Sequence, residues 1–331
     1  MSPVRIAVFG AGAWGTALAL AFCAKHRVVL WGRDPEHMRT LAESRSNARY
    51  LPGVPLPGEL ELTADFGAAA READLHLVVT PLAGLRAAVN DLHRFQPGTP
   101  LIWACKGLEA GTGKLPHEIV ADALGPDAAC GVLTGPSFAA EVARAMPTAV
   151  TLAATDPAFA KHWGQTLHQP RFRIYANSDL PGAEIGAAVK NVLAIAAGVS
   201  DGMGFGLNAR AALITRGLAE IARLAEALGG RAETLMGLAG MGDLILTCTG
   251  DLSRNRRVGL ALAQGKTLNE ILGELGHVAE GVPTAREVVK LAARHDVRMP
   301  LCEAVDALLH SPRLGPREVV EQLLSREPKH E

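Results

Sequence analysis

The sequence has no excess of charge of either sign, and this absence limits its partners. Its 331 residues carry 33 basic and 34 acidic side chains, which gives a net charge of −1. Proteins that bind nucleic acid or a membrane surface usually display a surplus of basic residues. We therefore expect no nucleic-acid partner, and any bound anion must be held by local groups.

Cysteine is scarce, and clusters of metal-binding residues are missing from the sequence. There are five cysteines and eleven histidines, with no Cys-x-x-Cys and no His-x-x-x-His. An odd number of scattered cysteines is typical of buried thiols in a reducing compartment, so we expect a cytoplasmic protein without disulfides. We also expect no metal site. The cysteines are Cys23, Cys105, Cys130, Cys248 and Cys302.

A long uninterrupted hydrophobic run is also missing. Residues 7–24 are apolar, but three glycines interrupt them and Lys25-His26-Arg27 ends them. This pattern favours a buried strand and helix of a soluble fold over a signal peptide or a membrane span.

Lysine is the rarer basic residue, with eight lysines among the 33 basic side chains. A lysine inside an apolar segment is therefore less easily explained as a general surface charge. Lys106 and Lys190 are two such lysines.

The N-terminal residues carry the strongest motif. An apolar strand over 4–9 leads into Gly10-Ala11-Gly12-Ala13-Trp14-Gly15, an alanine-rich helix over 16–25 and a second strand over 27–31. In such a turn Gly10 makes the bend, Gly12 lets the backbone approach a pyrophosphate and Gly15 lets the helix pack on the strand. The free N–H groups of the helix then face the phosphates. This order of elements predicts a dinucleotide-binding domain.

The end of the second strand bears on the choice of cofactor. NAD-binding domains usually place an acid there for the ribose hydroxyl, whereas an arginine accommodates a 2′-phosphate. This chain has Arg33 followed by Asp34. Arg33 favours NADPH, and Asp34 leaves NADH possible.

The pattern changes near residue 182. Before it, strands are expected at 60–63, 74–80, 101–105, 131–134, 148–153 and 171–175, with helices at 35–46 and 83–94. After it, only helical spacing is found, at 182–200, 206–228, 232–238, 255–264, 267–275, 282–295, 299–310 and 315–325. We predict an α/β Rossmann-type dinucleotide-binding domain over 1–181 and an all-α substrate domain over 182–331, with the active site between them.

Two loops of the first domain are candidates for ligand binding. Lys106 follows the strand at 101–105, and ligands of parallel sheets bind at the carboxyl ends of strands. After the strand at 131–134, Gly135-Pro136-Ser137-Phe138-Ala139 opens a helix. Ser137 is placed either to cap that helix or to contact a ligand.

Lys190 lies in an apolar helix beside small residues. None of its neighbours three or four positions away is acidic, so no local ion pair accounts for it. A lysine in such a place can have its pKa lowered enough for acid–base chemistry. The alternative is a lysine that extends to solvent. Asp243, in the expected turn 240–244, either orients a lysine or substrate hydroxyl or caps a helix.

A third candidate site is Ser253-Arg254-Asn255. Ser253 is expected to cap a helix whose first turn contains Arg254 and Arg256, although helix N-termini prefer acids. A bound phosphate would balance this charge. The alternative is a basic surface loop. Glu280 is ambiguous, because it could simply start the following helix.

Seven motifs in order carry a family resemblance. They are Gly10 to Gly15, Lys106-Gly107, Gly135 to Ala139, Val189-Lys190-Asn191, Gly240 to Leu244, Ser253-Arg254-Asn255 and Val278-Ala279-Glu280-Gly281. Together they resemble the NAD(P)-dependent glycerol-3-phosphate dehydrogenase family of bacterial type, over nearly the whole chain. The resemblance implies a cytosolic enzyme that interconverts dihydroxyacetone phosphate and sn-glycerol 3-phosphate for glycerophospholipid synthesis. A homodimer is also expected.

The resemblance also implies residue roles. Lys190 would be the catalytic acid/base, with Asp243 orienting it and Lys106 adding positive charge. The implied substrate contacts are Lys106, Gly135, Ser137, Lys190, Asp243, Ser253, Arg254 and Asn255. Besides Gly10, Gly12 and Gly15, the implied dinucleotide contacts are Ala13, Trp14, Arg33, Lys106, Ala139, Arg254, Val278 and Glu280. Ala13 departs from the family, which often has Ser or Asn there, so only its backbone can contribute.

Two other functions remain open. A related two-domain dehydrogenase acting on a β-hydroxyacid would need a site for a carboxylate, whereas Ser253-Arg254-Asn255 favours phosphate. A non-catalytic NADPH-binding sensor would need the fold but not Lys190.

Overall fold

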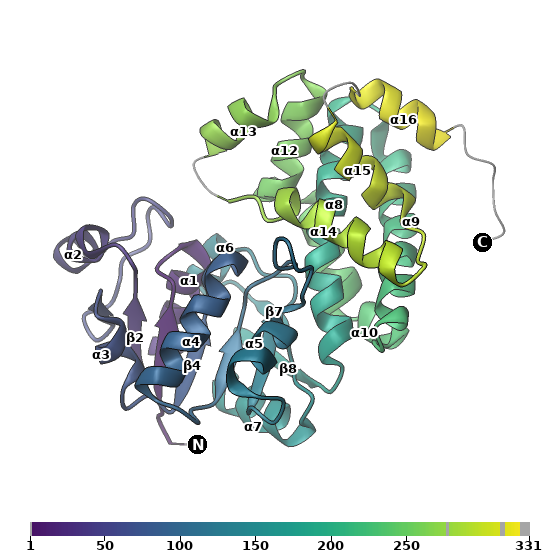
Figure 1. Ribbon diagram of the computed structural model, residues 1–331. Helices are drawn as coiled ribbons and strands as arrows, with labels where there is room; N and C mark the ends of the chain where they lie inside the picture. Colours follow the sequence, from purple (N-terminus) through teal and green to yellow (C-terminus); the bar gives the residue numbers. More distant parts are fainter. Residues whose placement is uncertain (1, 276–277, 312–314, 325–331) are drawn as a thin grey trace. The chain divides into compact units, whose positions relative to one another are not determined.

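The computed structural model describes residues 2–275, 278–311 and 315–324 (Figure 1). The chain divides into two compact units. The first comprises Met1–Lys106 and Pro116–Leu180, and the second comprises Gly107–Leu115 and Pro181–Glu331.

The first unit is built on an eight-stranded sheet in its described residues, with the order β3-β2-β1-β4-β5-β6-β7-β8. All neighbouring strands run parallel except β6 and β7, which are antiparallel. The strands are β1 Arg5–Phe9, β2 Arg27–Trp31, β3 Glu61–Thr63, β4 Leu75–Val78, β5 Leu101–Trp103, β6 Cys130–Thr134, β7 Thr148–Ala153 and β8 Phe172–Asn177. The sequence predicted each of them, because buried strands of a parallel sheet read as short apolar runs.

Helices cover this sheet. Helix α1 packs against α6, and α4 packs against α5 (Figure 1). The helices are α1 Ala13–Cys23, α2 Pro35–Ser44, α3 Phe66–Ala70, α4 Leu85–Phe95, α5 Pro116–Leu124, α6 Ala139–Ala143 and α7 Pro157–Leu167, and a 3₁₀ turn η1, Leu82–Gly84, precedes α4. Helices α3 and α5 were not predicted from the sequence. Helix α3 has only five residues, too few to establish a helical period.

The second unit contains only helices among its described elements, as the sequence predicted. They are α8 Leu180–Gly202, α9 Gly206–Ala227, α10 Ala232–Leu235, the π-helix η2 Leu238–Gly242, α11 Asp243–Thr249, α12 Arg254–Ala263, α13 Leu268–Leu275, α14 Gly281–Arg294, α15 Pro300–His310 and α16 Pro316–Leu324. The predicted turn at 240–244 was wrong. Residues 240–242 belong to η2, and Asp243 is the first residue of α11.

Helix α8 is the core of the second unit. It is long and apolar enough to cross a membrane, but 94% of its most apolar window is buried in the protein, so it is a core helix. Helix α12 packs very closely on it, because a Cβ at Gly198 or at Gly259 would lie 2.0 Å from a carbonyl oxygen of the other helix. At these two glycines the backbones of α8 and α12 therefore pack almost in direct contact.

The short segment 107–115 belongs to the helical unit, although the sequence range expected for the first domain includes it. Leu108 and Leu115 are buried in the same core as Val189. Arg294 Nη1 donates to the Thr112 carbonyl at 3.4 Å. Apolar burial thus explains why this excursion packs with the helices.

Candidate functional site

The glycine turn after β1 has the geometry that its sequence predicts. Gly10 has φ +128°, and a Cβ there would lie 2.7 Å from the Val79 carbonyl oxygen. A Cβ at Gly15 would lie 1.8 Å from the Gly10 oxygen, so α1 reaches the turn only because this residue is glycine. Gly12 differs, since a Cβ there meets nothing within 4 Å.

This open space lies at the start of α1, where Gly12 is the N-cap residue without a side chain. The first N–H groups of a helix have no acceptors inside it, and they favour an anion. Ala13 and Trp14 are the first two residues of α1, so their backbone N–H groups lie at this end. A dinucleotide pyrophosphate fits such a cradle.

Arg33 and Asp34 follow β2 and have different surroundings. Asp34 Oδ1 accepts the backbone N–H groups of Glu36 and His37, at 3.0 and 3.3 Å, and so caps α2. Arg33 is exposed, and no hydrogen bond or ion pair holds it among the described residues. The arginine is therefore available for a 2′-phosphate, whereas the aspartate already has a structural task.

Two further loops lie at the carboxyl ends of neighbouring strands. Lys106 follows β5, and Gly135 follows β6 with φ +135°. Of the two alternatives for Ser137, the one in which it caps the next helix is excluded. Its hydroxyl donates to the Gly135 carbonyl at 2.9 Å, and Phe138 occupies the N-cap position of α6 without a side-chain bond. The Ser137 hydroxyl thus stiffens the loop, and Ala139 opens the helix.

In the second unit, Lys190 and Asp243 come together in the core. Lys190 is 5% and Asp243 1% exposed, and Nζ lies 2.5 Å from Asp243 Oδ1. Lys190 therefore has an ionic partner on α11, although its own helix offers none. The alternative of a lysine extending to solvent is excluded by this burial.

Thr247 completes this cluster, and sequence reasoning missed it. Lys190 Nζ donates to Thr247 Oγ1 at 3.0 Å, and Thr247 donates to the Asp243 backbone carbonyl at 2.6 Å. Thr247 lies four residues after Asp243 on one face of α11, which is the signal that could have indicated it. Asp243 and Thr247 together hold the Lys190 ammonium group in one place.

The start of α12 is capped as predicted. Ser253 Oγ accepts the backbone N–H of Arg256 at 3.2 Å. Arg254, in the first turn, is exposed and has no hydrogen bond or ion pair among the described residues. Protein around its guanidinium still desolvates the charge and lowers the pKa of Arg254, while the Glu280 carboxylate acts in the opposite direction.

Arg256 has different surroundings from Arg254, and the expectation that a bound phosphate balances the charge of both arginines was wrong for Arg256. Arg256 Nη2 lies 2.7 Å from Asp201 Oδ2, and Nη1 lies 2.9 Å from Asp251 Oδ1. Two carboxylates thus compensate Arg256, whereas no ion pair compensates Arg254 among the described residues.

Asn255 is buried and ties three helices together. Its Nδ2 donates to Asn191 Oδ1 at 2.9 Å, and its Oδ1 accepts the Gly281 N–H at 3.0 Å. Asn191 directly follows Lys190, so this amide fixes α12 against the lysine helix and against the start of α14. Sequence reasoning had not given Asn191 this part.

Val278 and Glu280 lie before α14. Val278 is exposed, and Glu280 occupies the N-cap position of that helix. Glu280 thus starts the helix, and its contact with a dinucleotide stays a prediction. Two residues near it, Gly276 and His277, lie outside the described residues.

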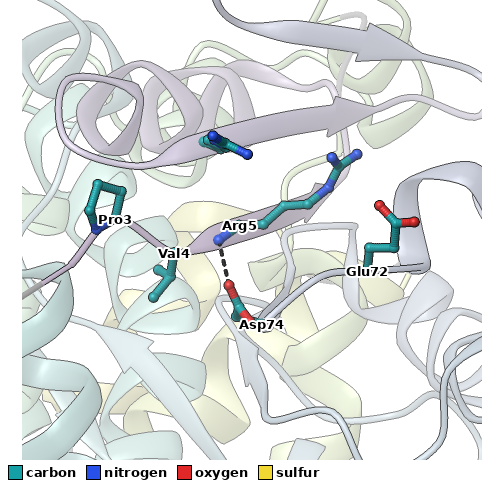
Figure 2. Close-up of a pocket in the computed structure, with 6 residues that line it drawn as sticks. Pro3, Val4, Arg5, Glu72 and Asp74 are labelled. Carbon is teal, nitrogen blue, oxygen red and sulfur yellow. Dashed lines mark hydrogen bonds between the residues drawn. The ribbon is translucent and has the colours of Figure 1, made fainter.

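A pocket of about 490 Å³ lies elsewhere, at the amino ends of β1 and β2 (Figure 2). Arg5, Arg27, Glu72 and Asp74 line it, and Asp74 accepts the Arg5 backbone N–H at 2.8 Å. Ligands of parallel sheets bind at the opposite ends of the strands, so this is not the candidate site. Within the described residues, no group of three or more His, Cys, Asp or Glu side chains is arranged to hold a metal ion.

Comparisons with known proteins agree along nearly the whole chain. The family described as NAD-dependent glycerol-3-phosphate dehydrogenase N-terminus matches residues 5–160, and the corresponding C-terminus family matches residues 179–321. A protein named glycerol-3-phosphate dehydrogenase [NAD(P)+] from Aromatoleum aromaticum is 86% identical over 99% of this chain and 100% of its own length. One of the same name from Dechloromonas aromatica is 60% identical over 99% of both chains.

A solved structure has the same fold. The glycerol-3-phosphate dehydrogenase of Coxiella burnetii is 43% identical, with a TM-score of 0.93 over 98% of this chain and 99% of that one.

Proposed function

This chain belongs to the NAD-dependent glycerol-3-phosphate dehydrogenase family, and we propose that it reduces dihydroxyacetone phosphate to sn-glycerol 3-phosphate with NADPH, reversibly. The observation that carries the proposal is the buried contact of Lys190 with Asp243 and Thr247. A buried, doubly held ammonium group is suited to proton transfer, and a non-catalytic sensor would have no use for it.

The chain's residues divide the reaction between them. When bound, the nicotinamide supplies the hydride for the C2 carbonyl. Lys190 donates a proton from Nζ to the oxygen that develops negative charge, and Asp243 and Thr247 orient that Nζ. Lys106 adds positive charge near the same oxygen. In the reverse direction Lys190 takes the proton from the C2 hydroxyl.

The substrate phosphate is assigned to the start of α12. The Ser253 cap, the free N–H groups of the first turn and the unpaired Arg254 support this assignment. Gly135 and Ser137 are proposed as contacts from the first unit. Asn255 contributes through its backbone N–H and the second hydrogen of its amide, since its other amide groups are engaged. The phosphate is remote from the reacting carbon, so it supplies binding energy for positioning.

NADPH is the preferred cofactor in this proposal. The exposed Arg33 and the helix-capping Asp34 support it. We further propose a cytoplasmic enzyme that supplies glycerophospholipid synthesis, supported by five free cysteines. A homodimer is proposed too, supported by the exposed apolar side chains Phe205 and Leu207 at the start of α9.

A coupled absorbance assay tests the function. Purified protein with NADPH and dihydroxyacetone phosphate should consume NADPH, and a β-ketoacid should not replace the phosphorylated substrate. Reduction of the β-ketoacid alone would favour the rival dehydrogenase. Tight NADPH binding without turnover of either substrate would favour the sensor.

A further inference from the structure

Asn47 lies in the loop after α2 and carries a fully buried amide that reaches the glycine turn. Its Nδ2 donates to the Ala11 carbonyl at 3.0 Å and to Thr16 Oγ1 at 2.8 Å. Ala11 lies between the first two motif glycines, and Thr16 is in the first helix after them. A side chain more than thirty residues away along the chain thus holds the turn.

The orientation of this amide is fixed by its partner. A carbonyl oxygen only accepts hydrogen bonds, so Nδ2 and not Oδ1 must face Ala11. The Oδ1 atom is buried and has no partner among the described residues. A buried acceptor without a partner costs stability. The Nδ2 group of Asn47 therefore makes the stabilising contacts, whereas its buried Oδ1 lowers the stability of the fold.

The backbone of Asn47 is itself held firmly. Its carbonyl accepts the N–H groups of Leu51 and Tyr50, at 2.7 and 3.2 Å, and Leu51 is buried in the core. The neighbouring Ser46 pairs with Pro55 in an isolated β-bridge. These backbone hydrogen bonds thus fix the position from which the Asn47 side chain reaches Ala11.

The bond to Ala11 determines where the next N–H points. A trans peptide is planar, and its C=O and N–H point in opposite directions. The described chain has no cis peptide bond, so the Gly12 N–H points away from Asn47. Within the described residues no acceptor binds this N–H, and the space beside Gly12 is open.

We propose that Asn47 is a positioning residue of the dinucleotide site. By holding the Ala11 carbonyl, it keeps the Gly12 N–H directed at the pyrophosphate. The inference rests on the dinucleotide site of the proposed function. Because NADPH and NADH share the pyrophosphate, Asn47 acts on both, whereas Arg33 acts on the 2′-phosphate of NADPH alone.

The test is Asn47→Leu, which keeps the size of the side chain and removes the donor. Dissociation constants for NADPH and NADH are measured from the fluorescence of the reduced nicotinamide, with circular dichroism as the check of folding. We expect both constants to rise by the same factor, about tenfold, because the Gly12 N–H is no longer held in the direction of the charged pyrophosphate. At saturating NADPH, kcat should stay near the wild-type value. Asn47→Ala is measured in parallel in case the leucine variant does not fold.

Thr16→Val is the matched control. It removes the second acceptor of the same amide and leaves the Ala11 bond in place, so it should lower the melting temperature without changing either dissociation constant. Wild-type cofactor affinity in a folded Asn47 variant would overturn the inference, as would an equal loss of affinity in Thr16→Val. Failure of the wild-type protein to bind either cofactor would instead refute the proposed function.

Discussion

The Asp201 carboxylate on α8 accepts a hydrogen bond from Nε of Arg256 on α12 at 2.8 Å, and Nη2 of the same arginine forms an ion pair with Asp201 Oδ2 at 2.7 Å. Arg254, two residues earlier in the same helical turn, has no such partner among the described residues. One arginine therefore binds the helix to its neighbour, and the other is available to a ligand. This difference separates two effects that a substitution in this turn can have.

Arg254→Ala should raise the KM for dihydroxyacetone phosphate at least about tenfold, because a charge-assisted bond to the phosphate is lost. Unphosphorylated dihydroxyacetone should be almost indifferent, since it has no phosphate. The melting temperature of the ligand-free protein should stay the same or rise slightly. Steady-state kinetics with both substrates and a thermal melt give these values.

Arg256→Ala is the control for that experiment. It leaves Asp201 with less positive charge around it, so the ligand-free melting temperature should fall by several degrees. If Arg254→Ala lowers the melting temperature instead, or weakens both substrates alike, the phosphate site lies elsewhere.

Lys190→Ala should lower kcat by roughly 10²–10⁴, the usual contribution of a general acid. The dissociation constant for NADPH should change little, because Lys190 is assigned to the substrate. Single-turnover kinetics and cofactor titration separate the two quantities. Lys290→Ala, on the exposed side chain that pairs with Glu287, serves as a charge-matched control. A folded Lys190→Ala enzyme with near-normal kcat would remove this lysine from the mechanism.

Arg33→Ala should weaken NADPH and leave NADH almost unchanged, because only NADPH carries the 2′-phosphate. Asp34→Ala should instead lower the free energy of unfolding by about 1 kcal/mol, because the cap of α2 is lost. The affinities for NADPH and NADH should stay unchanged. Titration of each variant with both cofactors gives the comparison. An equal loss of NADPH and NADH in Arg33→Ala would contradict the assignment.

Glu220 predicts a pH dependence of stability. Burial raises the pKa of this carboxyl to about 7, although the backbone N–H groups of Leu301 and Cys302 oppose the shift. The folded state then holds a proton that the unfolded state loses above about 4.5, so the free energy of unfolding falls as pH rises from there to about 7. The size of the loss is on the order of 3 kcal/mol.

Glu220→Gln removes this titration and keeps an acceptor for the Leu301 N–H. Urea unfolding at several pH values between about 4.5 and 7 should give a smaller decline for the variant than for the wild type. Parallel curves for the two proteins would show that Glu220 titrates normally.

Local patterns in the sequence predicted the features that depend on neighbouring residues. The glycine turn and the Ser253 cap are of this kind, because each is set within a few residues. Helix α5 was missed although it has nine residues, since Pro116 begins it directly after a loop rich in glycine. The π-helix before Asp243 was predicted to be a turn because it contains Gly240 and Gly242.

Contacts across long stretches of chain could not be predicted from local patterns. The family resemblance, and no local pattern, implied the contact of Lys190 with Asp243, which are 53 residues apart. The bond between Asn255 and Asn191, which are 64 residues apart, was not predicted at all. Only the packing of α8 against α11 and α12 brings them together. Asn47 was likewise inconspicuous, because a loop asparagine carries no periodic signal. Residues that position other groups are thus the ones that cannot be recognised from a single sequence.

Because segment 107–115 belongs to the second unit, the two units are not continuous stretches of the sequence. The chain passes between its two units three times, after Lys106, after Leu115 and after Leu180. A chimaera that joins the first 180 residues of this chain to the helical half of a relative would therefore combine Leu108 and Leu115 with a foreign core. Recombination between relatives should yield folded proteins most often when this nine-residue insert is inherited together with the helices that it packs against.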